Sequence, residues 1–288
     1  MSTRVAILGT GRMGSAIAQR LIRLDPALWD RTTSRAKEVG VGHVVATPAE
    51  AVRDADVVIS SLTGADALRE TFHGPAGALA GAHGQVFVEM STAGPDVLFE
   101  LDPQVRATGS TIVEAPILGG PSVMLKGGVA ILAAGAPADR ARVRPLLDLI
   151  GEVHEIGPLG SGARLKLVAN SMLGALTVSA AELQKAGEAV GLDPNEVFWA
   201  LARLVPSLEL RRAGYVERRH TPTLFAVRDL RKDLDLALDM FTESGARAPM
   251  TTVARDVFAE TSEHGGDNLE ITAVISQFTN EQHSGSSR

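Results

Sequence analysis

A lysine and an asparagine four positions apart, Lys166 and Asn170, have the clearest potential for chemistry in this sequence. Residues four apart on a helix share a face, so both side chains can act on one bound molecule. Leu165, Val168 and Met172 are apolar neighbours, and desolvation lowers the pKa of an ammonium towards the range useful for proton transfer. A lysine near the start of a helix is more often a solvated surface group, so this spacing leaves both interpretations open.

A second motif is a glycine-rich loop, Gly9-Thr10-Gly11-Arg12-Met13-Gly14, which fits the pattern G-x-G-x-x-G. An apolar run precedes the loop and a helical pattern follows it, which is the setting of a dinucleotide-binding loop. There Gly9 permits a tight turn, Gly11 lets the backbone approach a pyrophosphate, and Gly14 allows close packing of helix on sheet. The helix N-terminus adds N–H donors. We therefore predict that this loop binds a cofactor rather than serving only as a structural turn.

The residues about 20 positions further on indicate which dinucleotide fits. Asp30 favours a ribose diol and hence NAD. Arg31, Thr32 and Arg35 instead offer ligands for the 2′-phosphate of NADP, and a guanidinium binds phosphate through two parallel hydrogen bonds. Three phosphate ligands outnumber one carboxylate that can turn away. We therefore predict NADP, with NAD as the alternative, although both arginines could simply cover a solvated helix start.

Two kinds of hydrophobic pattern divide the chain into two halves. Short apolar runs alternate with helical stretches before Gly160, which predicts a mainly parallel sheet covered on both faces. After it, a helical pattern without a convincing break predicts one helix of roughly 40 Å. We expect a Rossmann-type α/β dinucleotide-binding domain over residues 1–161 and an all-α substrate and dimerisation domain over residues 162–288. The predicted strands are 4–8, 27–29, 56–61, 85–90, 111–114, 129–133 and 153–156, and the predicted helical segments are 13–24, 66–79 (in part), 163–190, 195–204, 224–241 and 250–263.

Composition excludes several classes of function. The 288 residues carry a net charge of -6, so nucleic acid is a poor candidate partner. Cysteine is absent, which excludes thiol catalysis and disulfides, and the seven histidines do not cluster at metal-binding spacing. We see no secretion signal and no apolar run long enough to span a bilayer, so we expect a cytoplasmic protein without a membrane partner. The polar tail from about residue 280 is expected to be disordered.

Four blocks in order resemble the β-hydroxyacid dehydrogenase family, which includes 3-hydroxyisobutyrate dehydrogenases and glyoxylate/succinic semialdehyde reductases. They are the glycine loop, a stretch similar to D-x-P-V-S-G-G, a stretch similar to G-x-G-x-x-x-K-x-x-x-N, and a stretch similar to K-D-L-x-L-A. Shorter matches lie between them, and the resemblance covers residues 3 to 278. The blocks after the glycine loop are Glu114–Gly120, Gly160–Asn170 and Lys232–Ala237, and the shorter matches are Trp29–Thr32, Val57–Leu62 and Glu89–Thr92.

The resemblance implies an oxidoreductase that reduces a small aldehyde or keto acid with NADP, or oxidises the β-hydroxyacid. Lys166 would be the acid/base that protonates the carbonyl oxygen, with Asn170 as its partner in holding the substrate. Subunits would pair into a homodimer or homotetramer. The positions implied at the ligands are Leu62, Thr92 and Lys232 for the cofactor, and Ser91, Gly119 and Gly120 for the substrate. The chemistry is sound physically, because an ammonium stabilises the negative charge on a carbonyl oxygen that receives a hydride.

The sequence departs from the family pattern most clearly at Leu118, which replaces a serine expected to hold a substrate carboxylate. Leucine cannot donate a hydrogen bond, so the pocket is predicted to be more apolar there, with Ser122 and the backbone of the two glycines left to bind an anion. Glu89 and Glu114 replace aspartates, which we interpret as minor changes. A neutral replacement at Leu118 and a changed substrate remain equally open.

Two other functions compete with this interpretation. An imine reductase would suit a more apolar pocket, but those enzymes resemble this family and usually lack the lysine. A catalytically silent nucleotide-binding protein is the other alternative, and the presence of both Lys166 and Asn170 weighs against it.

Overall fold

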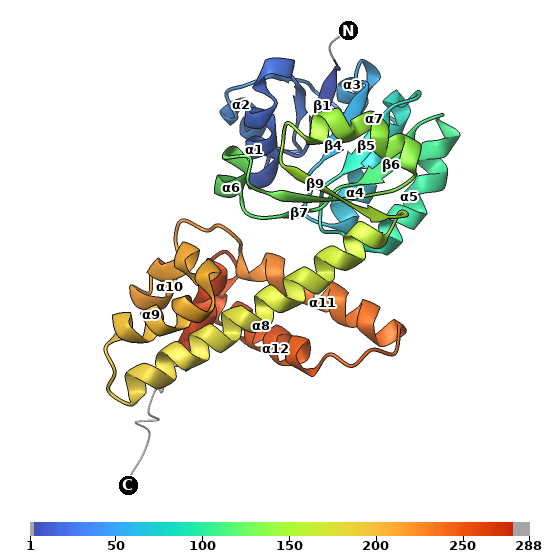
Figure 1. Ribbon diagram of the computed structural model, residues 1–288. Coiled ribbons are helices and arrows are strands. Elements are labelled where there is room, and N and C mark those ends of the chain that lie inside the picture. The colour runs from blue at the N-terminus through green and yellow to red at the C-terminus, as the bar shows by residue number, and fades with distance from the viewer. Residues whose placement is uncertain (1–2, 279–288) are drawn as a thin grey trace. The chain divides into compact units, whose positions relative to one another are not determined.

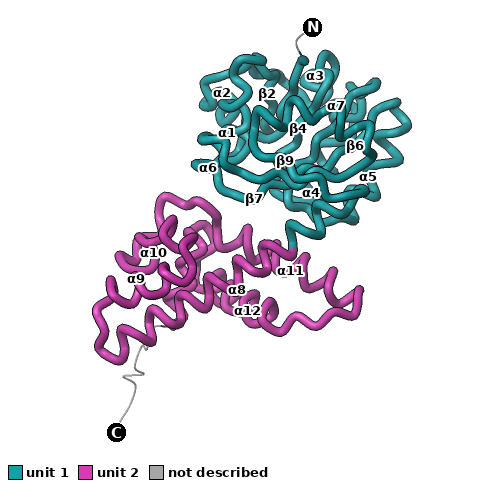
Figure 2. The backbone as a smooth tube through the Cα atoms, in the orientation of Figure 1, with its two compact units in different colours: residues 1–167 teal, residues 168–288 magenta. Residues whose placement is uncertain are grey.

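The computed structural model describes residues 3–278 and divides the chain into two compact units. Unit 1 is Met1–Leu167 and unit 2 is Val168–Arg288, drawn in teal and magenta in Figure 2. The division falls between Leu167 and Val168, inside the long helix α8 (Ser161–Ala189), whereas the boundary was predicted between residues 161 and 162. The polar tail predicted to be disordered lies outside the described residues.

Unit 1 contains a nine-stranded sheet over the described residues, with the order β3-β2-β1-β4-β5-β6-β8-β7 and β9 paired to β8. The pairs are parallel except for β6 with β8 and β7 with β8, so the predicted mainly parallel sheet is confirmed. The strands are β1 (Val5–Leu8), β2 (Ala27–Trp29), β3 (His43–Val44), β4 (Val57–Ser60), β5 (Val86–Glu89), β6 (Thr111–Glu114), β7 (Ile117–Leu118), β8 (Ala130–Ala134) and β9 (Glu152–Gly157).

Alternate residues of the central strands enter two separate hydrophobic cores. Val5 and Ile7 belong to one core, which α1 and α7 complete, whereas Ala6 and Leu8 belong to the other, which α3, α4 and α5 complete. Successive side chains of a strand point to opposite faces, so the sheet is covered on both faces as predicted. The helices, labelled in Figure 1, are α1 (Arg12–Arg20), α2 (Thr33–Glu38), α3 (Pro48–Arg53), α4 (Ala65–Phe72), α5 (Pro95–Ala107), α6 (Pro121–Leu125) and α7 (Pro137–Leu147).

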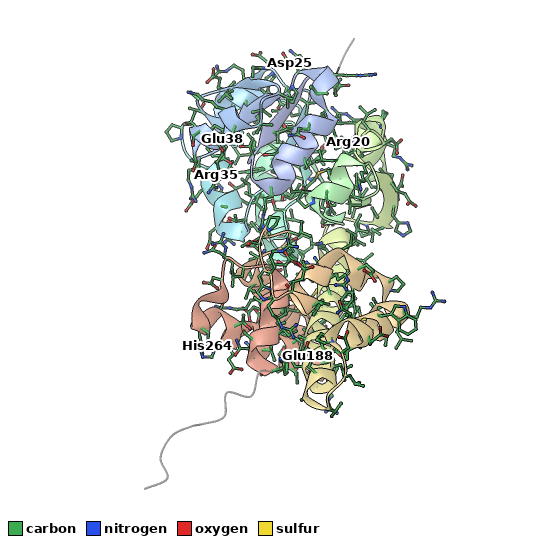
Figure 3. The ribbon with its side chains drawn as sticks, turned by 90° about the vertical axis from the view of Figure 1, so that its left-hand side faces the viewer. Arg20, Asp25, Arg35, Glu38, Glu188 and His264 are labelled. Atoms are coloured by element: carbon green, nitrogen blue, oxygen red, sulfur yellow. The ribbon has the colours of Figure 1, made fainter. Side chains whose placement is uncertain are left out.

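The first helix is shorter than the predicted span of residues 13–24. It ends at Arg20, and a separate 3₁₀ segment η1 (Ile22–Leu24) follows it. Asp25 then takes a left-handed conformation with φ of 47°, which turns the chain into β2. Arg20 and Asp25 mark these two ends in Figure 3, where Arg35 and Glu38 mark α2. The prediction of partial helix over 66–79 is confirmed by α4 and the 3₁₀ segment η2 (Ala78–Gly81).

Unit 2 is helical over its described residues, as predicted. The long yellow-green helix of Figure 1 is α8 (Ser161–Ala189), whose 29 residues correspond to ~44 Å at the usual rise. Two internal glycines do not break it, because Leu234 packs against Gly174 and Val197 packs against Gly187. The others are α9 (Pro194–Leu204), η3 (Pro206–Arg211), α10 (Arg212–Val216), α11 (Val227–Glu243), α12 (Pro249–Thr261), η4 (Ser262–Gly266) and η5 (Ile271–Phe278).

Helix α9 begins at Pro194, one residue before the predicted start at residue 195. Asp193 is the N-cap, and its carboxylate accepts hydrogen bonds from the N–H groups of Asn195 (2.8 Å) and Glu196 (3.4 Å). Pro194 occupies the first helical position, where its missing N–H costs no hydrogen bond.

Candidate active site

The glycine motif runs from the end of β1 into the first turn of α1, and its three glycines have different reasons to lack a side chain. Gly9 has φ of 94°, and a Cβ there would lie 2.4 Å from the carbonyl oxygen of Ser61. A Cβ on Gly14 would lie 1.9 Å from the carbonyl oxygen of Gly9. At Gly11, apart from the glycine and its chain neighbours, no atom of the described residues lies within 4 Å of such a Cβ. Packing therefore requires Gly9 and Gly14, whereas Gly11 leaves open space of the kind that a pyrophosphate needs.

The rest of the predicted loop divides between contact with solvent and contact with the core. Arg12 opens α1 and is exposed, while Met13 is half-buried and packs against the first core. Thr10 is buried, with 3% of its surface exposed. Only part of the loop is therefore accessible to a ligand from outside.

Asp30 fastens the glycine loop to the end of β2. One carboxylate oxygen accepts hydrogen bonds from the N–H (2.8 Å) and the hydroxyl (3.2 Å) of Thr10, and the other accepts from the N–H of Thr32 (2.8 Å). Asp30 is thus already occupied by three donors of the protein itself. This local role was not foreseen when the sequence was interpreted.

The predicted phosphate ligands all lie at the surface. Arg31 forms an ion pair with Glu70 at 3.1 Å, with 79% and 65% of the two side chains exposed. Such an exposed ion pair contributes little to stability, so Arg31 can readily exchange Glu70 for another anion. Thr32 and Arg35 are also exposed, at the N-cap and in the last turn of α2.

A buried carboxylate organises the loops that follow β4 and β5. Glu89, the last residue of β5, accepts hydrogen bonds from the hydroxyl of Ser60 and from the N–H of Ser91 (2.6 Å). The hydroxyl of Ser91 in turn accepts from the N–H of Leu62 (2.8 Å). Burial raises the pKa of Glu89 to about 7. The predicted ligand residues Leu62, Ser91 and Thr92 are half-buried, and the first two are joined in this network.

Lys166 lies against the predicted substrate loop within unit 1. Its Nζ donates a hydrogen bond to the carbonyl oxygen of Ile117 at 2.7 Å, and the side chain is half-buried. Ile117 and Leu118 form β7, and Gly119 follows with φ of 130°. The structure therefore brings the lysine next to the Leu118 loop.

The side chains of this substrate loop differ in burial. Leu118 and Gly120 are half-buried, and Gly119 and Ser122 are exposed. Met124 belongs to the first core, whereas Leu125 is 46% exposed. The apolar neighbours expected around Lys166 are not buried, because Leu165, Val168 and Met172 are 38%, 47% and 60% exposed.

Asn170 and Lys232 share a buried partner within unit 2. The amide nitrogen of Asn170 donates to Asp233 Oδ2 at 2.6 Å, and Lys232 Nζ lies 2.8 Å from Asp233 Oδ1. Asp233 is only 2% exposed. Asp233 lies within the motif Lys232–Ala237, but no role was predicted for it. Its carboxylate directly follows the predicted ligand residue Lys232, and this was the one sequence signal for such a role.

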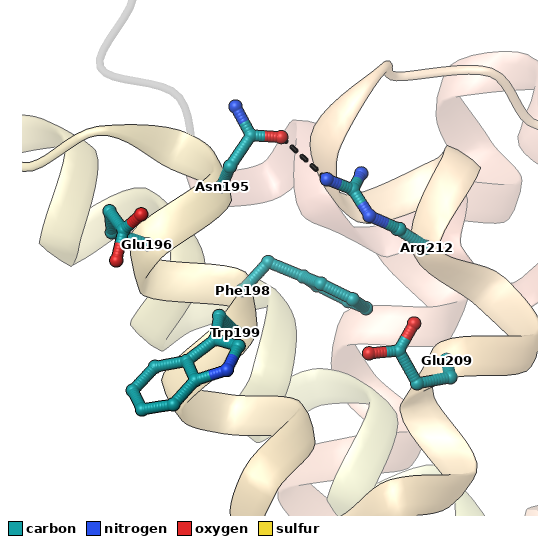
Figure 4. Close-up of a pocket in the computed structure, with 6 residues that line it drawn as sticks. All are labelled: Asn195, Glu196, Phe198, Trp199, Glu209 and Arg212. Atoms are coloured by element: carbon teal, nitrogen blue, oxygen red, sulfur yellow. Dashed lines mark hydrogen bonds between the residues drawn. The ribbon is translucent and has the colours of Figure 1, made fainter.

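A pocket in unit 2 contains none of the predicted site residues. Figure 4 shows it between α9, η3 and α10, where Arg212 donates to Asn195 Oδ1 at 2.5 Å and lies over the ring of Phe198. The guanidinium is thus engaged by the protein itself. The pocket lining is Asn195, Glu196, Phe198, Trp199, Glu209 and Arg212.

Residues 3–278 lack two features that would point to other classes of site. No helix there combines the length and apolar character needed to cross a membrane. No group of three or more histidine, aspartate and glutamate side chains in the same residues is placed to hold a metal ion.

Comparison with known families covers nearly all the described residues. Residues 4–160 match the NAD binding domain of 6-phosphogluconate dehydrogenase, and residues 160–278 match the NAD-binding family of NADP-dependent 3-hydroxyisobutyrate dehydrogenase. The open glycine loop on a mainly parallel sheet fits the dinucleotide that these families bind. The protein is therefore an NAD(P)-dependent oxidoreductase.

Individual relatives are similar to this chain over most of its length. Glyoxylate/succinic semialdehyde reductase 2 of Arabidopsis thaliana is 29% identical over 94% of this chain and 78% of its own. The 2-(hydroxymethyl)glutarate dehydrogenase of Eubacterium barkeri is 27% identical over 95% and 94%. A solved 3-hydroxyisobutyrate dehydrogenase of Mycobacterium tuberculosis, with L-serine, has a TM-score of 0.81 at 26% identity over 96% and 99%. The chain belongs to the β-hydroxyacid dehydrogenase family, as predicted.

Proposed function

We propose that this protein uses NADP to reduce a small aldehyde or keto acid, or to oxidise the corresponding β-hydroxyacid, with Lys166 as the acid/base. The observation that carries the proposal is the hydrogen bond of 2.7 Å from Lys166 Nζ to Ile117. This bond fixes a proton donor beside the predicted substrate loop. An ammonium has three N–H donors, so it can hold this carbonyl and also donate to a substrate oxygen.

The proposed roles follow from the charge that develops on the substrate. When bound, the nicotinamide cofactor supplies the hydride. Lys166 stabilises the negative charge on the carbonyl oxygen and gives that oxygen a proton, and in oxidation it removes the hydroxyl proton. Asn170 is proposed to hold the substrate, with its amide oriented by Asp233. Thr92 and Lys232 are proposed to contact the cofactor.

The preference for NADP over NAD is supported by the contacts of Asp30. Three donors from Thr10 and Thr32 already occupy its carboxylate, which leaves it a poorer acceptor for a ribose diol. Arg31 is exposed just before α2, and Arg35 is exposed in the last turn of α2. Guanidinium groups at these positions can bind a 2′-phosphate. KM values for both cofactors test this preference, and a strong preference for NAD would refute it.

The substrate pocket is proposed to be more apolar than the family pattern implies. Leu118 is half-buried in β7 and offers no hydrogen-bond donor from its side chain. The N–H groups of Gly119 and Gly120 and the exposed hydroxyl of Ser122 are the proposed anion ligands. A small carbonyl compound with an apolar substituent fits this set best.

The direct test is to assay a panel of aldehydes, keto acids, hydroxyacids and cyclic imines as substrates. Turnover is measured as the change in absorbance of NADPH or NADH. The expected result is carbonyl reduction with NADPH. Turnover of cyclic imines alone would support the imine reductase that Leu118 favours and would overturn the proposal. Cofactor binding without turnover of any compound would indicate a nucleotide-binding protein instead.

Self-association is also proposed, as a homodimer or homotetramer. Unit 2 exposes large apolar side chains, including Trp199 (64%), Leu204 (82%) and Met250 (63%). Burial of such side chains between subunits would be favourable. Light scattering in solution tests this, and a monomer at all concentrations would contradict it.

A further inference from the structure

The first turn of α8 is fastened to the end of β6 by a buried carboxylate. Glu114 is the last residue of β6 and is only 1% exposed. Its Oε1 accepts a hydrogen bond from the N–H of Gly162 (3.2 Å), and its Oε2 accepts from the N–H of Ala163 (2.8 Å). These N–H groups have no partner inside the helix, so the carboxylate acts as the cap of α8.

Two glycines allow the helix to start so close to the sheet. A Cβ on Gly162 would lie 2.8 Å from the carbonyl oxygen of Leu132 and 3.3 Å from Glu114 Cδ. Gly160 has φ of 91°, and a Cβ there would lie 2.6 Å from the ring of Phe99. The glycines of the motif G-x-G-x-x-x-K therefore serve the placement of this helix start.

The segment from Glu114 to Ile117 makes a second contact with α8, one helical turn after the first. Ile117, three residues after Glu114, accepts the hydrogen bond from Lys166 Nζ. Lys166 follows Gly162 by four residues, a rise of ~6 Å along the helix. A shift or rotation of the first turn thus moves the ammonium relative to the loop that Ile117 and Leu118 form.

We propose that Glu114 is a positioning residue for Lys166, whose ionised carboxylate sets where the acid/base stands. The inference rests on the proposed role of Lys166. Both oxygens accept N–H groups, so the site requires two acceptors, which a carboxylate has and an amide does not. Burial raises the pKa of Glu114, which the hydrogen bonds from the α8 backbone oppose. Glutamine would place an NH₂ group against a buried N–H and force the first turn to move.

Two variants disturb this contact from opposite sides. Glu114→Gln removes one acceptor, and Gly162→Ala inserts a methyl group between α8 and the sheet. Thr47→Ala is the matched control, because Thr47 caps α3 by accepting from Glu50 N–H (3.1 Å) in the same unit. The readouts are Tm, kcat and KM, and the rate at which Lys166 is methylated by formaldehyde and cyanoborohydride in the cofactor-free protein, followed by peptide mass spectrometry.

The expected result for both site variants is a kcat lowered roughly tenfold to a hundredfold, a KM changed much less, and a rate of Lys166 methylation changed severalfold. Thr47→Ala should lower Tm while kcat and Lys166 methylation stay at wild-type values. Wild-type kcat and methylation in Glu114→Gln, or in Gly162→Ala if the first variant does not fold, would overturn the proposal. An active Lys166→Ala enzyme would instead refute the proposed function, and the methylation result would still report on the positioning contact.

Discussion

Glu89 should make the stability of unit 1 fall as the pH rises, and replacement by glutamine isolates this effect. Burial raises the pKa of Glu89 from 4.5 to about 7. The folded protein therefore keeps a proton that the unfolded chain releases. The stabilisation is fully present below about pH 4.5 and is lost as the pH rises through about 7.

The size of the effect follows from the difference between the two pKa values. That difference corresponds to at most about 3 kcal/mol of unfolding free energy, lost between pH 4.5 and 7. Glutamine resembles the protonated carboxyl, since its oxygen can still accept the N–H of Ser91 and its NH₂ can donate to Ser60. Glu89→Gln should therefore be close to the wild type in stability at acid pH and more stable above pH 7.

Urea unfolding at several pH values between 5 and 8 measures this difference. Trp29 lies in β2, and the substitution Trp199→Phe removes the other tryptophan, so that fluorescence then reports unit 1 alone. Glu38→Gln on the exposed face of α2 controls for the loss of one negative charge. Wild-type and Glu89→Gln stabilities that run parallel across this range would refute the reasoning.

Four further outcomes follow from single residues. Gly14→Ala should prevent stable folding of unit 1, because its Cβ would lie 1.9 Å from Gly9 O. Gly11→Ala should keep the wild-type Tm, and calorimetry should show NADPH binding weakened roughly tenfold, or ~1.4 kcal/mol. Asp193→Ala should lower the urea midpoint of unit 2, since two N–H groups lose their acceptor. Asp233→Asn should cost about 2 kcal/mol in the same assay, and an unchanged urea midpoint would exclude the buried contacts with Asn170 and Lys232.

The elements that follow from local pattern were predicted well. The runs at β1, β4 and β5 are apolar except for Ser60 and Glu89, the last residues of β4 and β5, because both faces of each strand are buried. At the start of α9, Asp193 supplies the capping group. The two-residue strands β3 and β7 were not predicted. Strands so short have no periodicity to detect and exist only through pairing with β2 and β8.

The proposed ligand residues were predicted from motifs, but the contacts that hold them were not predicted. Glu114 meets the start of α8 at a separation of 48 residues, and Asn170 meets Asp233 at a separation of 63. Nothing in the local sequence reports such pairings. Glu89 and Glu114 were interpreted as minor replacements, yet each is a buried carboxylate that holds a loop or a helix of the candidate site. Their roles depend on burial, which only the folded chain defines.

The most direct test of the proposed chemistry compares Lys166→Ala with Lys185→Ala, a lysine on the same helix that pairs with Glu188 at 2.9 Å. Both proteins should bind NADPH with wild-type affinity, measured by its fluorescence. With a carbonyl substrate from the panel, kcat should fall by about 10²- to 10⁴-fold in Lys166→Ala alone. A kcat near the wild-type value in Lys166→Ala would contradict the assignment of Lys166 as the acid/base.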